Sequence, residues 1–404
     1  MPQKPVYLSK IRIRAYRSCR SVALTLEPDI TTLIGPNGSG KTNILQAITL
    51  LRARSTSLNR APKKETSPVR CQIEAEFVVR RRPILFRANI FLRQNEQNED
   101  ELLFEYNKWN FKAISGKNEW TVATDLYERD LLAKLGHIKT IRSKSAPKIA
   151  RKTERMAHRL ITEFCSSIGY YGASQFTKPG LCPTSFEVNK DGSLLETNVQ
   201  SDHVKFMYDL FLMKDRNPTL YENYISLLDS RGLNLVDKIS WRTAKFSSSI
   251  FEVKAGGKVQ SRKTGKVLII PTIHIRKSQL SFNQLSEGTF RTLALIFYIV
   301  TDRSHVLLVE EPEVCIHHGL LNSIIEVIKS FSRDKQIIFS THSEAVVDQL
   351  KPSNLRLVKN LRTRGTTITP ISHALSSKGY EALKRYLEKS GNLGEYWRHS
   401  GFER

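Results

Sequence analysis

The first third of the chain alternates apolar and polar residues with a period of two, which is typical of β-strands that are buried on one face. The clearest case is 7–16, where basic and apolar side chains take turns. This pattern predicts strands over 7–16, 23–26, 31–34, 71–79, 84–92 and 102–111. A helix is expected over 43–51, and 52–69 is expected to be an irregular connection. The last three strands predict an antiparallel sheet.

The final third has a different hydrophobic pattern, in which short apolar runs alternate with longer amphipathic segments. Strands are predicted over 306–309 and 336–340, and helices are predicted to begin at Glu287, Leu320 and Glu344. This alternation is typical of a mainly parallel sheet with helical crossovers. We therefore expect an α/β fold in which the first and last thirds build one domain.

The middle third is expected to be an insertion. The pattern is helical over 123–166 and 195–240, with a short strand at 170–173 between them. No heptad run of useful length occurs, so no long coiled coil is expected. The expected divisions are 1–60 and 271–370 for the α/β domain, 61–120 for an antiparallel β arm, 121–270 for a mainly helical insertion and 371–404 for a tail helix.

The formal net charge of the chain is +24, and this excess of basic residues indicates what kind of partner it binds. Such a field favours polyanions, and DNA or RNA is the expected partner class. The alternatives are a solvated basic surface without a partner and a surface that docks an acidic protein, such as a phage protein that mimics nucleic acid. Basic residues are densest over 142–159 and 254–277.

Cysteine spacing and hydropathy indicate the cellular compartment in which the chain is expected. The five cysteines lie far apart without ligand spacing, which favours free thiols in a reducing cytoplasm over a zinc site. No apolar run is long enough to span a bilayer, and the N-terminus lacks the apolar segment of a signal peptide. We expect a cytoplasmic chain without a membrane partner.

The strongest chemical signal is a glycine-rich loop between a predicted strand and a predicted helix. Its residues are Gly35, Pro36, Asn37, Gly38, Ser39, Gly40, Lys41, Thr42 and Asn43. Glycines allow backbone N–H groups to turn toward phosphate oxygens, and the helix N-terminus adds positive potential. Lys41 would neutralise the β- and γ-phosphates of ATP, and Thr42 would offer a hydroxyl to Mg²⁺.

Two carboxylates follow the apolar strand 306–309. Glu310 is expected near the metal, and Glu311 is the candidate base that activates water for attack on the γ-phosphate. Such strands usually place Asp at the first of these positions. The longer side chain of Glu310 still permits a metal contact, directly or through water.

Three weaker signals accompany these motifs. Ser286 and Gly288 open a helix, where a capped, glycine-containing start can approach an anion. His342 follows the strand 336–340 and could hydrogen-bond a γ-phosphate. Gln175 follows the short strand 170–173 and could reach Mg²⁺ and the attacking water.

In this order the motifs resemble those of ABC-class ATPases of the SMC, RecF and OLD group. The likeness is carried by the opening Ile11 to Ser18, the loop through Ile48, the run Glu310 to Glu313 and the element Phe339 to Ser343, which resemble the OLD-like group classed as AAA_15 or AAA_21. The resemblance implies an ABC-type ATPase head with a mixed sheet, and ATP with Mg²⁺ as ligands. It implies homodimerisation through composite sites, in which Ser286 and Gly288 of one chain contact ATP on the other, and a higher oligomer is an open alternative.

The resemblance also suggests two functions. As a stand-alone OLD-like ATPase, a chain of this size resembles the ATPases of the anti-phage systems Septu and PARIS. This resemblance implies a regulatory ATPase that acts with a separately encoded nuclease effector of the HNH or Toprim kind. Too little chain follows His342 for a nuclease of its own. The alternative is a RecF-like repair clamp that binds duplex DNA without an effector. A transporter ATPase is disfavoured by the strand-rich arm.

Overall fold

The computed structural model describes most of the chain. The described residues are 4–52, 69–80, 82–95, 98–113, 121–122, 156, 159–172, 176–194, 201–253, 259–314, 316, 318–389 and 391–399. Four predictions therefore lie wholly or largely outside them: the irregular connection, over 53–68, the first helical stretch, over 123–155, the basic cluster from Arg142 through Arg155, and Gln175. The described chain divides into two compact units, 1–171 with 303–312 and 328–404, and 172–302 with 313–327.

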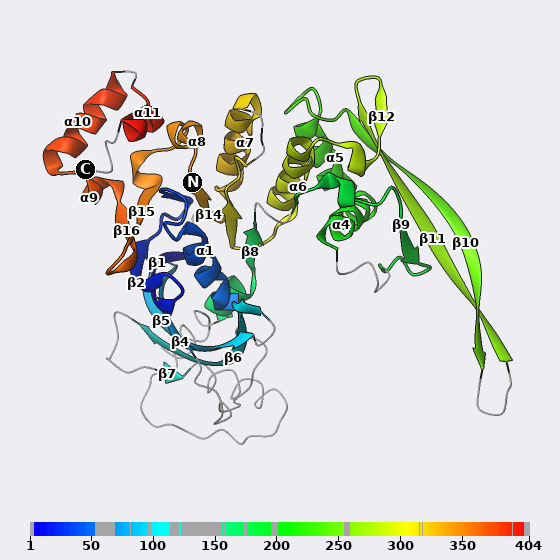
Figure 1. Ribbon diagram of the computed structural model, residues 1–404, viewed down its shortest axis with the longest axis horizontal. Helices are drawn as coiled ribbons and strands as arrows, with labels where there is room; N and C mark the ends of the chain where they lie inside the picture. Colours follow the sequence, from blue (N-terminus) through cyan, green and yellow to red (C-terminus); the bar gives the residue numbers. More distant parts are fainter. Residues whose placement is uncertain are drawn as a thin grey trace. The chain divides into compact units, whose positions relative to one another are not determined.

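The first unit contains an antiparallel sheet built by the alternating segments of the N-terminal third (Figure 1). Its strand order is β2 (Cys19–Thr25), β1 (Val6–Tyr16), β4 (Val69–Val79), β5 (Arg82–Asn95), β6 (Asn98–Ala113) and β7 (Thr121–Val122). In β1, Ile11 and Ile13 are fully buried, while Arg12 between them and Arg14 after them are exposed. The predicted half-buried strand and the predicted antiparallel sheet are confirmed.

A second sheet in the same unit is mainly parallel. Its order is β16 (Gly365–Pro370), β15 (Leu355–Leu361), β3 (Ile30–Ile34), β14 (Gln336–Thr341), β13 (Val306–Glu310) and β8 (Ile168–Tyr171). All neighbours are parallel except β16, which pairs antiparallel with β15. The expected α/β fold with a mixed sheet is confirmed, and the hairpin of β15 and β16 is an element that the sequence pattern did not reveal.

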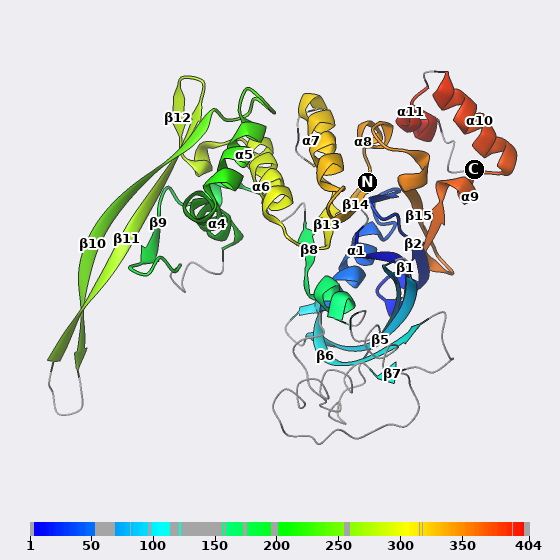
Figure 2. The same ribbon diagram turned by 180° about the vertical axis from the view of Figure 1, so that it is seen from behind.

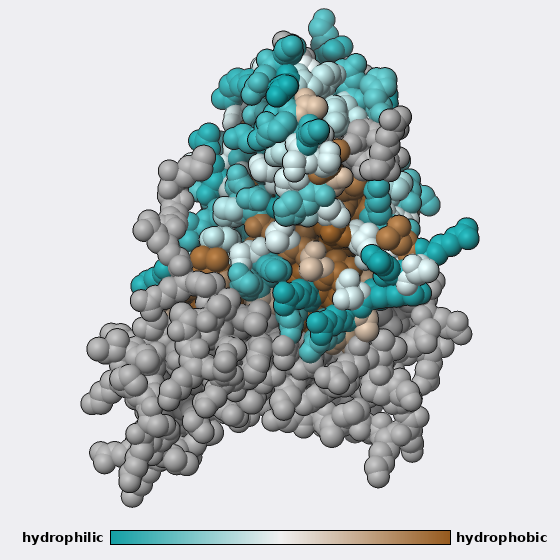
Figure 3. Space-filling model, turned by 90° about the vertical axis from the view of Figure 1, so that its left-hand side faces the viewer, coloured by the Kyte–Doolittle hydropathy of each residue, from teal (hydrophilic) through white to brown (hydrophobic). Residues whose placement is uncertain are grey.

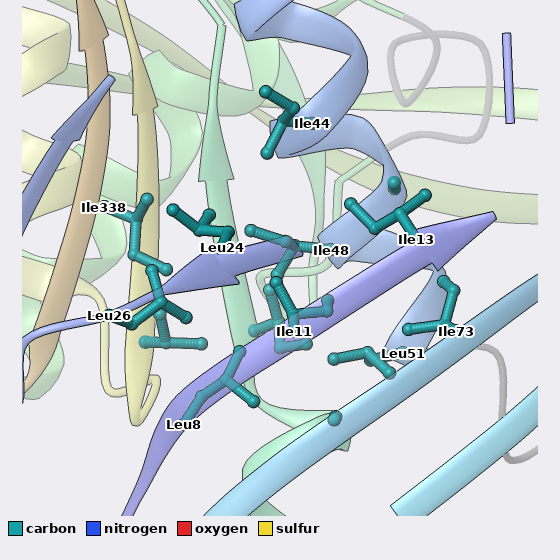
Figure 4. Close-up of a cluster of buried hydrophobic side chains, with 14 of the residues drawn as sticks. Leu8, Ile11, Ile13, Leu24, Leu26, Ile44, Ile48, Leu51, Ile73 and Ile338 are labelled. Atoms are coloured by element: carbon teal, nitrogen blue, oxygen red, sulfur yellow. The ribbon is translucent and has the colours of Figure 1, made fainter. Parts of the chain in front are cut away.

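Helix α1 (Lys41–Thr49) contacts strands of both sheets. A single apolar cluster joins Ile44 and Ile48 of this helix to Ile11 and Ile73 of the antiparallel sheet and to Ile338 of the parallel sheet (Figure 4). Burial of such side chains contributes about 1.5–3 kcal/mol each. The helix that follows the glycine-rich loop is therefore held from two sides.

The remaining elements of this unit follow the parallel strands. They are α8 (Glu344–Asp348), α9 (Ile371–Ala374), α10 (Ser377–Glu388) and α11 (Leu393–Arg398). The face that carries α10 and α11 is largely hydrophilic toward its upper end (Figure 3). The sequence predicted one tail helix over 371–404, and the described residues of this region form three, α9, α10 and α11. Asn392 starts the last of them by accepting a hydrogen bond from the Glu395 amide at 2.7 Å.

The second unit combines helices with a long β-ribbon. Its elements are β9 (Phe186–Asn189), α4 (Asp202–Arg216), α5 (Pro218–Leu228), β10 (Lys238–Val253), β11 (Val259–Ile275), β12 (Ser278–Leu280) and α6 (Glu287–Thr301). Helix α7 (His318–Phe331) spans the boundary between the units along the chain. Phe206, Phe282 and Phe290 pack edge to face within the second unit, and the ring of His203 stacks on Phe290.

The expectation of a mainly helical insertion over 121–270 is wrong for its last part. Strands β10 and β11 pair without interruption from Lys238 and His274 to Val253 and Val259 (Figure 2). The reason is a period of two: Ile269, Pro271 and Ile273 are buried while the residues between them are not. The division also differs from the expected one, since α6 belongs to the second unit.

No helix among the described residues is long and apolar enough to cross a bilayer.

Candidate functional site

The glycine-rich loop connects β3 to α1, as the sequence predicted. Gly35, Gly38 and Gly40 have φ angles of 151°, 75° and 102°, a half of conformational space that favours glycine. A Cβ on Gly35 would lie 2.3 Å from the Val358 carbonyl oxygen, and one on Gly40 would lie 2.1 Å from Thr366 Oγ1. Both glycines are therefore required by conformation and by space.

Lys41 is the first residue of α1 and is only 5% exposed. Its Nζ donates hydrogen bonds to the carbonyl oxygens of Gly35 at 2.8 Å and of Pro36 at 3.1 Å. The ammonium group thus lies across the loop, at the N-terminus of a helix without acidic residues in its first turn. Two sources of positive potential meet where a phosphate would be cradled.

Ser39 provides a test of whether the loop fits an anion. Its side chain is 2% exposed, and within the described part of the chain its Oγ has no hydrogen-bond partner. A buried hydroxyl without a partner costs about 1–3 kcal/mol. An anionic ligand in the loop would satisfy this group, so the loop fits a phosphate.

A chain of hydrogen bonds through Ser18 and Thr366 stabilises the glycine-rich loop. Asn43 Nδ2 donates to Ser18 Oγ at 2.7 Å, Ser18 Oγ and Thr366 Oγ1 are 2.7 Å apart, and Thr366 Oγ1 donates to the Ser39 carbonyl at 3.1 Å. Asn43, predicted as a nucleotide-binding residue, thus has its side-chain amide on Ser18. The bracing roles of Ser18 and Thr366 were not predicted, because only the fold brings β16 to the loop.

The parallel register places the ends of three strands at one edge. Ile34 of β3 pairs with Thr341 of β14, and Glu310 of β13 pairs with Ser340 of β14. The carboxyl ends of parallel strands are where such sheets bind ligands. The glycine-rich loop, the two acids and His342 leave the sheet at this edge, as their positions after predicted strands suggested.

Glu310 lies next to the first turn of α1. Thr42 Oγ1 donates a hydrogen bond to Glu310 Oε1, and the hydroxyl of Tyr170 on β8 donates to Glu310 Oε2 at 2.7 Å. Burial, and then the Glu310 carboxylate, raise the pKa of the Tyr170 phenol well above its usual range. A hydroxyl and a carboxylate side by side are the hard oxygen donors that Mg²⁺ prefers, so this pair fits the predicted metal site.

Beside the pair of Thr42 and Glu310, the side chains of Glu311 and His342 form a second pair of polar groups. Nδ1 of His342 is 3.5 Å from Oε1 of Glu311, with 45% and 26% of the side chains exposed. Glu311 has a φ of 44° and donates its N–H to the Ser340 carbonyl at 3.0 Å, which fixes the turn at the end of β13. An imidazole beside a carboxylate can orient it or exchange a proton with it.

The second unit holds the predicted helix start. Ser286 is exposed and caps α6, with its Oγ accepting a hydrogen bond from the Thr289 amide at 3.2 Å. Gly288 follows in the first turn, and Arg291 pairs with Glu287 at 3.1 Å. Ser286 and Gly288 thus belong to the second unit, while the other described predicted site residues lie in the first.

Sequence reasoning did not find Tyr170. It lies in the short strand that precedes the predicted Gln175, so its position was noted but its side chain was not. The only signal was its place on the predicted short strand 170–173. That β8 pairs with β13, which brings Tyr170 to Glu310, is a matter of topology.

Comparison with known proteins identifies the family. The sequence model of AAA_21, described as "AAA domain, putative AbiEii toxin, Type IV TA system", matches residues 30–348. This range includes the described phosphate loop, both acids, the α6 start and His342.

The similar proteins include DNA replication and repair proteins RecF. That of Arthrobacter sp. (strain FB24) is 47% identical over 51 residues, 13% of this chain and 13% of its own length. That of Beutenbergia cavernae is 34% identical over 87 residues, 21% of this chain and 22% of its own length. The likeness to these relatives spans less than a quarter of either chain.

The similar solved structures are heads of SMC proteins. The SMC head domain from Thermotoga maritima is 15% identical, with 90% of this chain and 98% of that chain covered and a TM-score of 0.44. The SmcHead bound to the C-winged helix domain of ScpA is 14% identical, with 90% and 97% covered and a TM-score of 0.48.

The family match extends over most of the chain and includes the phosphate loop, the paired acids and the capped helix start whose order the sequence displayed. The chain belongs to the AAA_21 family.

Proposed function

We propose that this chain binds ATP with Mg²⁺ at the loop between β3 and α1 and hydrolyses it. The observation that carries the proposal is the contact of Thr42 with Glu310, beside the pair of Glu311 and His342 at the same sheet edge. A phosphate cradle, a metal-binding oxygen pair and a carboxylate that can accept a proton are what hydrolysis of a phosphoanhydride requires.

Each group has a distinct task. Lys41 exchanges the loop carbonyls for phosphate oxygens when ATP binds. Thr42 and Glu310 would hold Mg²⁺, which neutralises charge on the phosphates. Glu311 accepts the proton of the attacking water, and His342 orients Glu311 and donates to the terminal phosphate.

The site is completed by a second copy of the chain. Ser286 is exposed at the N-terminus of the 15-residue helix α6, and it would contact the terminal phosphate of ATP held by the partner. ATP then acts as a removable cross-link between two heads, and hydrolysis opens the pair.

Mixing two inactive variants tests this arrangement. Lys41→Ala removes binding in its own loop, and Ser286→Arg blocks the site of the opposite chain. A mixed dimer has one site with both lesions and one with neither, so hydrolysis should return. Ser323→Arg, at an exposed position on α7, is the matched control and should stay active alone. No recovery under conditions where subunits exchange would contradict the composite site.

We further infer that the chain regulates a separately encoded effector nuclease in anti-phage defence. The family description names type IV toxin–antitoxin systems, in which one gene product acts with another, and this supports the two-component reading. Mass measurement of the complex purified from its native host tests it. A complex containing only copies of this chain, with and without ATP, would contradict it.

The second candidate is a RecF-like clamp on duplex DNA, favoured by the RecF matches. It predicts ATP-dependent DNA binding by the chain alone. Charge reversal at Arg151, Lys152 and Arg155 should weaken that binding and flatten its salt dependence by about one unit of slope per lost phosphate contact. Identical slopes for parent and variant would assign this cluster to a protein partner instead.

A further inference from the structure

Helix α11 packs against α8, the helix that follows β14 and His342 (Figure 1). A cavity of about 240 Å³ in the first unit is lined by Gly35, Pro36, His342, Glu344, Trp397 and Arg398. Three of these residues belong to the proposed phosphate-binding apparatus or follow it directly. Trp397 and Arg398 come from α11, and no motif singled them out.

Helix α11 is held in this position by specific contacts with α8. The Gly394 amide donates a hydrogen bond to Asp348 Oδ1, and a Cβ on Gly394 would lie 2.4 Å from the Glu344 carbonyl oxygen. Leu393 is 2% exposed. A side chain at Gly394 would force the two helices apart, so their close approach is built into the sequence.

Arg398 is tethered at the cavity by an exposed ion pair. Its Nε donates to Glu344 Oε2 at 2.5 Å, and its Nη2 contacts the same carboxylate, with 66% of the Arg398 side chain exposed. The arginine hydrogen bond lowers the pKa of the Glu344 carboxyl. Such exposed pairs contribute little stability, because water screens both charges. The guanidinium can therefore change partners at low cost.

A terminal phosphate would be the stronger partner. It carries more negative charge than one carboxylate, and its oxygens match the planar guanidinium fork. On the cavity wall, His342 is the residue that the proposed function places at the terminal phosphate, and Gly35 and Pro36 belong to the loop that would bind ATP.

We propose that Arg398 is a further ATP-binding residue, which contacts the γ-phosphate by leaving Glu344. This inference rests on the proposed binding of ATP and adds a γ-phosphate contact from the tail of the same chain. ADP lacks that phosphate, so Arg398 would make the tail helix respond to ATP and not to ADP. Trp397, next to it on the cavity wall, would report the change.

Calorimetry on the full chain with Mg²⁺ tests the assignment, using adenylyl imidodiphosphate and ADP as probes. Arg398→Gln should weaken binding of the ATP analogue by about ten- to a hundredfold, as expected for a lost charge-assisted hydrogen bond, and leave ADP binding within about twofold. Arg398→Lys should recover part of the loss, since it keeps the charge but not the fork. The control is Lys384→Gln, which breaks an exposed ion pair within α10 (2.8 Å to Glu381) and should change neither affinity.

Two further measurements keep the test independent of folding. Glu344→Gln frees Arg398 and should preserve or raise affinity for the analogue, and a fall would contradict the exchange. The analogue, but not ADP, should change the tryptophan fluorescence of the parent, and Trp397→Phe should abolish that change.

The outcomes separate the two proposals. If the parent binds neither nucleotide, the proposed function fails. If the parent binds both and Arg398→Gln alters the two affinities equally or not at all, ATP binding stands and the role of Arg398 is wrong.

Discussion

Substitution of Gly35 by alanine should be far more damaging than the same change at Gly38, three residues away. Both glycines have positive φ, so each alanine incurs backbone strain of about 1–3 kcal/mol. At Gly35 the new Cβ also lies 2.3 Å from the Val358 carbonyl oxygen of β15, where backbone must move, whereas at Gly38 nothing lies within 4 Å. Overpacking of this kind costs about 1–3 kcal/mol more. We therefore expect Gly35→Ala to lose about 2–6 kcal/mol and Gly38→Ala about 1–3 kcal/mol.

Urea unfolding without nucleotide measures this difference, so that lost phosphate contacts do not enter. Because the chain has two compact units, the transition of the first should be followed through hydrogen exchange of the β3 and β15 amides, which report the affected sheet directly. Gly38→Ala serves as the control for backbone strain alone. Equal loss of stability in the two variants would refute the steric reasoning and leave the φ angles as the sole reason for glycine.

The remaining predictions concern the chemistry of the site and one buried thiol. Lys41→Ala should abolish ATP binding in calorimetry, because each lost charge-assisted contact costs about 1.5–3 kcal/mol. Glu311→Gln should retain ATP while steady-state hydrolysis falls about a hundredfold or more, and a variant with the parental rate would move the base elsewhere. Tyr170→Phe removes a hydrogen bond to Glu310, so the Mg²⁺ concentration for half-maximal hydrolysis should rise about tenfold, as for other outer partners of metal ligands; an unchanged requirement would separate Glu310 from the metal. Burial raises the pKa of the Cys71 thiol from 9.0 to about 12, so the unfolded state loses this proton at a lower pH than the folded state does. The free energy of unfolding should therefore fall as pH rises above 9, by up to about 1.4 kcal/mol per pH unit. Cys71→Ala should flatten this pH dependence when urea unfolding is compared at pH 8 and pH 10.

Much of the candidate site was readable in the sequence because its parts are local. A phosphate loop needs glycines at fixed offsets, a strand before it and a helix after it, and all of these lie between Ile30 and Thr49. The acids Glu310 and Glu311 and the later His342 each follow an apolar run. The parallel strands then bring these segment ends to one edge, as the α/β alternation predicted.

Local patterns predicted secondary structure less well where the spacing of apolar residues did not distinguish a helix from a strand. Residues 238–270 lie in the predicted mainly helical insertion, yet they belong to the paired ribbon of β10 and β11, because strand pairing depends on a partner that lies elsewhere in the chain. Likewise β15 and β16 have no chemical signature, although Thr366 of β16 braces the phosphate loop.

The sequence by itself therefore determined the fold class, the order of the motifs and the residues proposed to bind phosphate, since each depends on a short segment with its own conformational needs. The tertiary structure alone decided which distant side chains act together. Thr42 meets Glu310 across 268 residues, Tyr170 meets the same carboxylate across 140, and Arg398 returns to Glu344 across 54. No local propensity encodes such contacts, because they follow from strand order, register and helix packing, which the chain settles only when its core is buried as a whole.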